Sequence, residues 1–231
     1  MQLNGKTILL TGGTDGIGRA LATQLKAKGA EVVVTGRTAE RVAEMQAAGF
    51  ETIMAELSSQ AGVDAVLAAV KGRDIDVLIN NAGAGSDHDF REGAPDLGDN
   101  DRCIALNLNT PIHLITHLMD VLKAQPEAMI VNVTSGLAIA PRAGGPIYCA
   151  TKAGLRSYTL ALRAQLKDTQ IRVLEVLPPI VETKMTAGRG NRKMSPQDCA
   201  AQIVNAMETN AKEANVGLTK ILRLVYSMSP A

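Results

Sequence analysis

The chain has 231 residues, of which 46% are hydrophobic and 20% are charged, and its formal net charge is +1. This composition supplies a sizeable core and excludes an ordinary disordered polymer, while the well-mixed charges give no basic face for general nucleic-acid binding. Three cysteines show neither a paired framework nor metal-ligand spacing, the N-terminus lacks the apolar stretch of a signal peptide, and no apolar run is long enough to span a bilayer. We therefore expect a cytoplasmic protein with no metal site, no nucleic-acid partner and no membrane span.

Short β-branched or aliphatic runs alternate with longer stretches of helical period along the chain. The predicted strands lie near Thr7–Thr11, Glu31–Thr35, Thr52–Ala55, Val77–Asn80, Met129–Val133 and Arg172–Leu177. The predicted helices lie near Ile17–Lys28, Glu40–Ala48, Gly62–Lys71, Asp99–Lys123, Tyr148–Lys167 and Pro196–Asn210. This order predicts a single domain over residues 1–231, an α/β three-layer Rossmann fold with a doubly wound, mostly parallel sheet flanked by helices.

A glycine-rich turn follows the first predicted strand, in the run Thr11-Gly-Gly-Thr-Asp-Gly-Ile-Gly18. Glycines let the backbone turn tightly and approach a pyrophosphate, whose charge is met by the amide groups and dipole at the helix start. Tight packing of strand on helix explains an isolated turn equally well, but the place of this turn at the first strand–helix junction favours a dinucleotide. The cofactor-binding residues expected here are Thr11, Gly12, Thr14, Asp15, Gly16, Ile17 and Gly18.

The second predicted strand ends in Val34-Thr35-Gly36-Arg37-Thr38, without an Asp or Glu to accept hydrogen bonds from both hydroxyls of a ribose. Arg37 offers a permanently charged fork that suits the 2′-phosphate of NADPH, and Thr14 and Arg19 could add to the same site. The alternative for Arg37 is a solvated surface arginine. We expect NADP(H) to be preferred, with NAD(H) as the second choice.

Tyr148 and Lys152 lie four residues apart on one face of a predicted helix, and this pair predicts a catalytic acid or base. The ammonium would favour the phenolate and lower the pKa of Tyr148 toward neutrality, which makes the phenol a usable acid or base. A surface pair on an amphipathic helix explains a lone Tyr-x-x-x-Lys as well. Ser135 ends the preceding strand, where its hydroxyl can orient a substrate carbonyl.

Five motifs, in this order, resemble the short-chain dehydrogenase/reductase family in its ordinary single-domain branch, over the chain up to about Asn210. They are the glycine turn, the box Asn80-Asn81-Ala82-Gly83, Asn107, Ser135, and Tyr148 with Lys152. The resemblance implies that Tyr148 donates or accepts the proton, Ser135 holds the substrate oxygen, Lys152 also binds the nicotinamide ribose and Asn107 supports a water-linked proton relay. It also implies cofactor contacts by Glu56, Leu57, Asn81, Ala82, Gly83, Tyr148, Lys152, Pro178, Val181 and Thr183.

The resemblance predicts an NAD(P)-dependent oxidoreductase, as an NADPH-dependent reductase of a ketone or aldehyde to an alcohol. Its partner would be a small-molecule carbonyl or alcohol. A catalytically silent dinucleotide-binding sensor or scaffold is the alternative, although such a protein has no physical need for a tuned phenol. Epimerase or dehydratase relatives generally carry a larger C-terminal substrate region, for which this chain has no room.

The chain departs from the family pattern at three places. Pro179 stands where the family usually has Gly, and Glu56 stands where it usually has Asp. The family usually ends in a seventh strand and a Gly-containing tail. This chain instead has the atypical, short C-terminus Asn215–Ala231. A short strand near Val216 followed by a helix is one structure that this segment could form. Because the family's tetramer uses that end, we expect a homodimer through the helices near Asp99–Lys123 and Tyr148–Lys167.

Two further patterns carry hypotheses about ligands. The segment Lys184–Met194 resembles the family's mobile lid and holds four cations, Lys184, Arg189, Arg192 and Lys193, which with Arg142 could hold an acidic substrate or could simply be solvated. His113 and His117 have a spacing that can bind zinc, but no Glu follows His113, so two polar positions on a packed or interface helix are expected instead.

Overall fold

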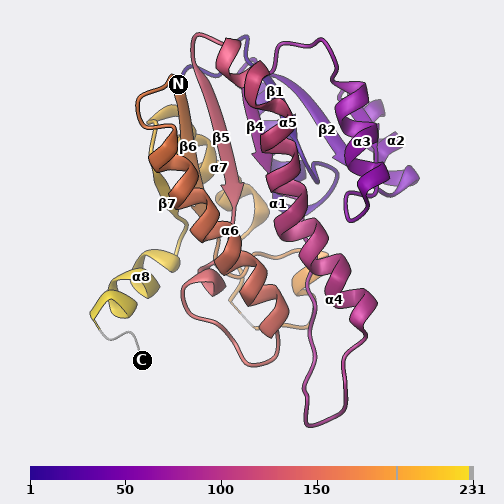
Figure 1. The fold of residues 1–231 in the computed structure, drawn as a ribbon, viewed down its shortest axis with the longest axis vertical. Helices are drawn as coiled ribbons and strands as arrows, with labels where there is room; N and C mark the ends of the chain where they lie inside the picture. The colour runs from indigo at the N-terminus through magenta and orange to yellow at the C-terminus, as the bar shows by residue number, and fades with distance from the viewer. Residues whose placement is uncertain (191, 229–231) are drawn as a thin grey trace.

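One parallel sheet organises the protein, for which the computed structural model describes residues 1–190 and 192–228. Its strand order is β3-β2-β1-β4-β5-β6-β7 (Figure 1). The strands are β1 Thr7–Leu10, β2 Glu31–Gly36, β3 Glu51–Met54, β4 Val77–Asn80, β5 Ala128–Val133, β6 Ile171–Leu177 and β7 Glu213–Asn215. The order reverses between β1 and β4, so a ligand is expected beyond the carboxyl ends of the strands at this point.

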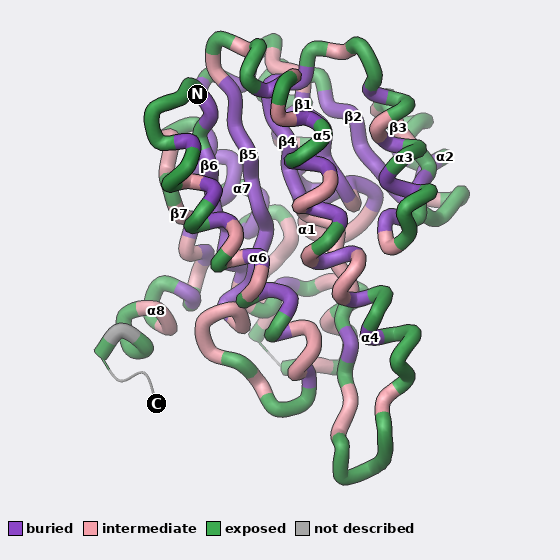
Figure 2. The backbone as a smooth tube through the Cα atoms, in the orientation of Figure 1, coloured by how far each residue is buried: buried purple, intermediate pink, exposed green. Residues whose placement is uncertain are grey.

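Helices cover both faces of the sheet and make two hydrophobic cores. They are α1 Gly16–Ala27, α2 Ala39–Ala47, α3 Gln60–Ala69, α4 Leu97–Ile104, α5 Thr110–Ala124, α6 Pro146–Gln165, α7 Pro196–Glu208 and α8 Thr219–Met228. Alternate residues of β1 point to opposite faces: Ile8 and Leu10 pack with α1 and α7, whereas Leu9 packs with α3, α5 and α6. Figure 2 shows the central strands buried between these layers. The predicted three-layer Rossmann architecture is confirmed.

The prediction of one uninterrupted helix over Asp99–Lys123 is wrong, because the structure divides this segment. It consists of α4, a π-helical turn at Ala105–Asn109 and α5. Pro111 lies in the first turn of α5 and has no backbone N–H to donate to the preceding turn, and one extra residue is accommodated there. The turn contains Asn107, which is fully buried.

The C-terminal segment forms the seventh strand and a helix. β7 pairs in parallel with β6, ending just before Val216, and α8 follows (Figure 1). The helix extends away from the body and exposes the apolar side chains of Ile221, Leu224 and Val225. Residue 191 of the expected lid and residues 229–231 of the tail lie outside the described residues. Within the described chain, no helix has both the length and the apolar character needed to cross a membrane.

Candidate active site

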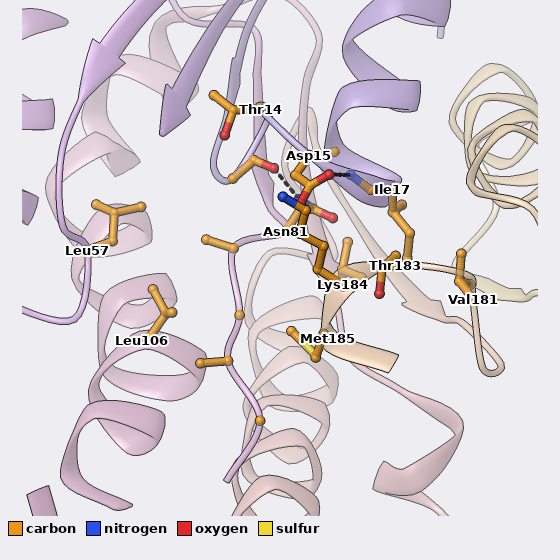
Figure 3. A pocket seen from close by; sticks show the side chains of 18 of the residues that line it. Thr14, Asp15, Ile17, Leu57, Asn81, Leu106, Val181, Thr183, Lys184 and Met185 are labelled. Carbon is orange, nitrogen blue, oxygen red and sulfur yellow. Dashed lines mark hydrogen bonds between the residues drawn. The ribbon is translucent and has the colours of Figure 1, made fainter. Parts of the chain in front are cut away.

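A cavity of about 660 Å³ lies beyond the carboxyl ends of the strands and collects most of the predicted site. Its walls include these residues expected from the sequence: Gly12, Thr14, Asp15, Gly16, Ile17, Gly18, Arg37, Glu56, Leu57, Asn81, Ala82, Gly83, Ser135, Tyr148, Lys152, Pro178, Val181 and Thr183. In Figure 3, Leu57 and Leu106 lie on one side of the cavity and Thr183, Lys184 and Met185 on the other. Two expected residues, Thr11 and Asn107, stand behind the wall.

The glycine turn between β1 and α1 has no room for a side chain at its glycine positions. Gly12 has a φ of 66°, and a Cβ there would lie 2.9 Å from the Cα of Ala82. A Cβ on Gly18 would lie 2.0 Å from the carbonyl oxygen of Gly12, and one on Gly16 would lie 2.8 Å from the Cγ2 of Thr183. The turn therefore leaves a bare-backbone cradle at the start of α1, which fits the pyrophosphate of a dinucleotide.

Thr11 supports this cradle from behind. Its buried hydroxyl accepts hydrogen bonds from the backbone amides of Asn81 and Ala82, both at 3.0 Å. The Asn81 side chain in turn donates to the carbonyl oxygens of Thr11 and Gly12, at 3.0 and 3.1 Å. These bonds join the glycine turn to the segment after β4. Thr11 thus positions the wall and does not face the cavity.

The end of the cavity beside β2, where the adenosine of a dinucleotide is expected and which we call the adenosine end, carries two arginines. Arg37 lies with its Nη1 3.6 Å from the Oε2 of Glu56, and Arg41, in the first turn of α2, pairs with Asp15 at 2.7 Å. Burial raises the pKa of Glu56, but hydrogen bonds from Ser58 and the charge of Arg37 outweigh it, so this pKa is lowered overall. Both arginines line the cavity.

Sequence reasoning missed Arg41. It also suggested Arg19 for the phosphate site, and the structure pairs Arg19 with Glu44 instead. The signal for Arg41 was its place in the first turn of the helix that follows β2, only four positions after Arg37. Arg19, by contrast, donates to Glu44 at 2.8 Å and is not among the residues that line the large cavity. The suggestion that Arg19 adds to the phosphate site thus gains no support from the large cavity and stays a prediction.

The chemical end joins β5 and α6. Ser135 begins a short 3-10 helix after β5, and its Oγ accepts a hydrogen bond from the Leu137 amide at 3.1 Å. Tyr148 lies in the first turn of α6, half-buried, and Lys152 follows one turn later. The Lys152 ammonium is 5.9 Å from the centre of the Tyr148 ring. All three side chains line the same end of the cavity.

The expected lowering of the Tyr148 pKa is wrong in this structure. Burial raises the pKa of Tyr148 above its usual value, and hydrogen bonding with Ser135 only partly opposes this. The lysine loses solvation as well, so burial lowers the pKa of Lys152 to about 8. The physical reason is that desolvation dominates both groups, whereas the spacing of the two residues indicates only the effect of charge.

Asn107 has a structural place. Its Nδ2 donates to the carbonyl oxygen of Ala84 at 2.9 Å and to the hydroxyl of Thr151 at 3.1 Å, and its Oδ1 accepts from the Ala84 amide at 2.9 Å. These partners occupy the side-chain amide, which therefore ties the segment after β4 to α6. The side chain positions the wall behind Lys152 and does not face the cavity.

Three loops meet beside the end of the cavity that holds Ser135 and Tyr148, where the substrate is expected. Asp87, from the segment after β4, pairs with Arg142, from the loop before α6, and with Arg189, from the segment after β6. The expected lid is held near its base as well, because Lys193 donates to the Thr186 carbonyl oxygen at 2.6 Å. One of the lid cations, Arg189, thus has an acidic partner, which comes from a different loop. The two histidines of α5 belong to no potential metal cluster among the residues described.

Comparison with known proteins places the chain among oxidoreductases. The family model described as short chain dehydrogenase matches residues 6–194. The "uncharacterized oxidoreductase DltE" of Bacillus subtilis (strain 168) is 41% identical over 187 residues, covering 79% of this chain and 74% of that protein. The "serine 3-dehydrogenase" of Agrobacterium fabrum is 35% identical over 198 residues, covering 82% of this chain and 78% of that protein.

Solved structures share the fold. A short chain dehydrogenase from Burkholderia cenocepacia, in complex with NADP, has a TM-score of 0.89 at 24% identity and covers 100% of this chain and 96% of its own. A 3-ketoacyl-(acyl-carrier-protein) reductase from Brucella melitensis, complexed with NADH, has a TM-score of 0.83 at 27% identity and covers 91% and 96%. Nicotinamide dinucleotides with and without the 2′-phosphate therefore occur with this fold.

Proposed function

The chain belongs to the short-chain dehydrogenase family and is an NAD(P)-dependent oxidoreductase, and from this premise we propose that it is an NADPH-dependent reductase of a ketone or aldehyde. The observation that carries the proposal is the single cavity that unites the glycine turn and two arginines at one end with Ser135, Tyr148 and Lys152 at the other. A sensor or scaffold would need the first end only. The second end has no use without turnover.

The residues of the chemical end have separate roles. Tyr148 donates its proton to the substrate oxygen, and Ser135 holds that oxygen by a hydrogen bond. Lys152 stabilises the phenolate that remains. When bound, the nicotinamide supplies the hydride. Because its pKa is raised, Tyr148 is protonated at neutral pH, which suits the acid that reduction of a carbonyl requires.

The preference for NADPH is supported by the two arginines at the adenosine end. A 2′-phosphate brings negative charge to a site where Arg37 is only loosely paired and Arg41 is in reach. No carboxylate follows directly on β2 to repel that phosphate or to hold both hydroxyls of a ribose. Glu56 competes for Arg37, so the preference is expected to be moderate.

The substrate class we propose is a short carboxylic acid with a carbonyl or hydroxyl at carbon 3. One relative is named a serine 3-dehydrogenase, and another, 29% identical over 240 residues, is named an NADP-dependent 3-hydroxy acid dehydrogenase. The test is NADPH and NADH oxidation with aldehydes, ketones, keto acids and sugars. Turnover of none of these, with intact cofactor binding, would favour the sensor.

We further propose a single domain over residues 1–231 that forms a homodimer in the cytoplasm. The single seven-stranded sheet supports the domain assignment. An exposed leucine on α6, Leu160, supports a contact through this helix. The three cysteines are buried, unpaired thiols, as expected in a reducing compartment. Light scattering of the purified protein would test the dimer.

A further inference from the structure

Asp87 holds two guanidinium groups at once. Its Oδ1 accepts a hydrogen bond from the Nη2 of Arg142, and its Oδ2 accepts one from the Nη2 of Arg189. The three residues come from three different segments, so each carboxylate oxygen joins the loop after β4 to another wall of the cavity. A single carboxylate between two permanent cations leaves this cluster with a charge of about +1.

This cluster lies at the substrate end of the cavity. Asp87 and Arg189 line the same space as Ser135 and Tyr148. Arg142 is not among the lining residues and lies against the start of α6, since a Cβ on Gly145 would lie 2.8 Å from its Nη2. The charge of Arg189 also acts on Tyr148: burial is the main influence and raises the pKa of that phenol, while Arg189 contributes in the lowering direction.

Both guanidiniums have N–H donors that Asp87 does not use and that can bind a second anion. Each engages Asp87 through one nitrogen, and a guanidinium carries five N–H donors. About a third of each of the three side chains is exposed, and the pair of Asp87 and Arg189 lines the cavity, so an anion in the cavity can reach this pair. Glycines flank Arg189 on both sides, with φ of 75° at Gly188 and 62° at Gly190. The backbone there adopts a conformation that glycine takes at low cost.

We propose that Arg189 holds the carboxylate of the substrate, with Arg142 as the second cation behind Asp87, and that Asp87 occupies the place of this carboxylate as an internal anion until the substrate binds. The inference rests on the proposed reductase function and assigns residues to its substrate class. An incoming carboxylate takes over donors from Asp87 and brings the cluster from about +1 to neutral. An uncharged substrate has no such gain, because it leaves both arginines on Asp87.

The experiment compares 3-oxobutanoate with its ethyl ester, using NADPH, at low and high salt. Arg189→Gln is expected to lower the ratio of kcat/KM for the acid to that for the ester by about tenfold, since a charge-assisted contact is lost. Asp87→Asn is expected to raise the same ratio by about threefold, because the competing internal anion is gone. In the unmodified protein, salt should reduce kcat/KM for the acid more than for the ester.

Asp89 and Arg91 provide the matched controls. They form an ion pair within the same loop as Asp87, and neither is among the residues that line the cavity. Asp89→Asn and Arg91→Gln should therefore leave the acid-to-ester ratio unchanged. If Asp87→Asn and Arg189→Gln also leave it unchanged, or alter both substrates equally, the cluster only ties the loops together and the inference is overturned.

Failure of the proposed function gives a different result. If the unmodified protein reduces neither compound, binding of 3-hydroxybutanoate and its ethyl ester is measured by calorimetry in the presence of NADP⁺. Tighter binding of the acid that Arg189→Gln abolishes would support the subsite without any turnover. Equal binding of acid and ester would contradict it.

Discussion

The Lys152 ammonium donates a hydrogen bond to the Val133 carbonyl oxygen at 2.9 Å. This bond ties α6 to the end of β5, two residues before Ser135, so the lysine holds the two elements of the chemical end in register. Lys152 is only 4% exposed, and burial lowers its pKa to about 8. Because the pKa of this buried ammonium lies close to neutral pH, the charge of the site is sensitive to pH.

The rate of carbonyl reduction is expected to fall as the pH rises through about 8. Above that value Lys152 loses its proton, and the phenolate formed at Tyr148 loses its stabilising charge. Tyr148 itself stays protonated in this range because its pKa is raised. The profile of kcat/KM reports groups of the free enzyme, so it is the measurement to use. Lys152→Arg should remove the inflection, since arginine stays charged; an unchanged inflection in that variant would assign it to another group.

Tyr148→Phe is expected to remove turnover and to leave cofactor affinity nearly intact. The change deletes the proton donor and keeps the ring, and the loss in kcat should be about 100-fold or more. Fluorescence titration with NADPH measures the affinity separately. Tyr158→Phe is the control, because Tyr158 lies on the same helix but packs against the hydrophobic core. Retention of most kcat in Tyr148→Phe would contradict the mechanism.

Local patterns were enough to predict the parts of the site that neighbouring residues determine. The glycine turn, the strands and the position of Tyr148 and Lys152 on one helix follow from spacing, and the structure brings them to one cavity. What the sequence could not show depends on long-range placement. Arg189 and Asp87 are 102 positions apart, so their pairing is set by the whole fold. Desolvation of Tyr148 likewise depends on the packing around it.

The π-helical turn was also beyond prediction from periodicity. A single extra residue barely changes the hydrophobic pattern of a long helix, so this pattern predicts one continuous helix from α4 to α5. The turn contains Asn107, whose side chain bonds to the backbone of Ala84 and to Thr151. The proline at position 111 was a signal that could have been used.

Arg37→Asp is expected to reverse the preference from NADPH to NADH. The change removes a cation at the 2′-phosphate and supplies a carboxylate for the ribose hydroxyls. Arg37 is 62% exposed and shares its charge with Glu56, so the preference it gives is expected to be about tenfold, at the lower end for charge-assisted contacts. The measurement is kcat/KM for each cofactor with one carbonyl substrate.

Arg19→Gln is the matched control for this prediction. Arg19 pairs with Glu44 and is not among the lining residues of the cofactor cavity. Its replacement should leave the ratio of the two cofactors unchanged. Equal constants for NADPH and NADH in the unmodified protein would remove the role assigned to Arg37.

Arg156→Ala is expected to destabilise the protein by about 3–5 kcal/mol, because it leaves a buried carboxylate without its cation. Glu175 is fully buried, and its Oε2 lies 2.5 Å from the Nη1 of Arg156. The exposed pair of Arg73 and Glu51 is the comparison, and Arg73→Ala should cost at most about 1 kcal/mol. Urea unfolding of the two variants gives both free energies.

The same change should also reach the chemical end of the cavity. The other oxygen of Glu175 accepts a hydrogen bond from the Thr134 hydroxyl at 2.8 Å, and Thr134 directly precedes Ser135. Loss of Arg156 frees this carboxylate to shift, so kcat is expected to fall in the folded fraction of Arg156→Ala. Thr134→Val removes the link but keeps the ion pair, and should lower kcat with a smaller loss of stability. If Thr134→Val keeps full kcat, the buried pair stabilises the fold without positioning Ser135.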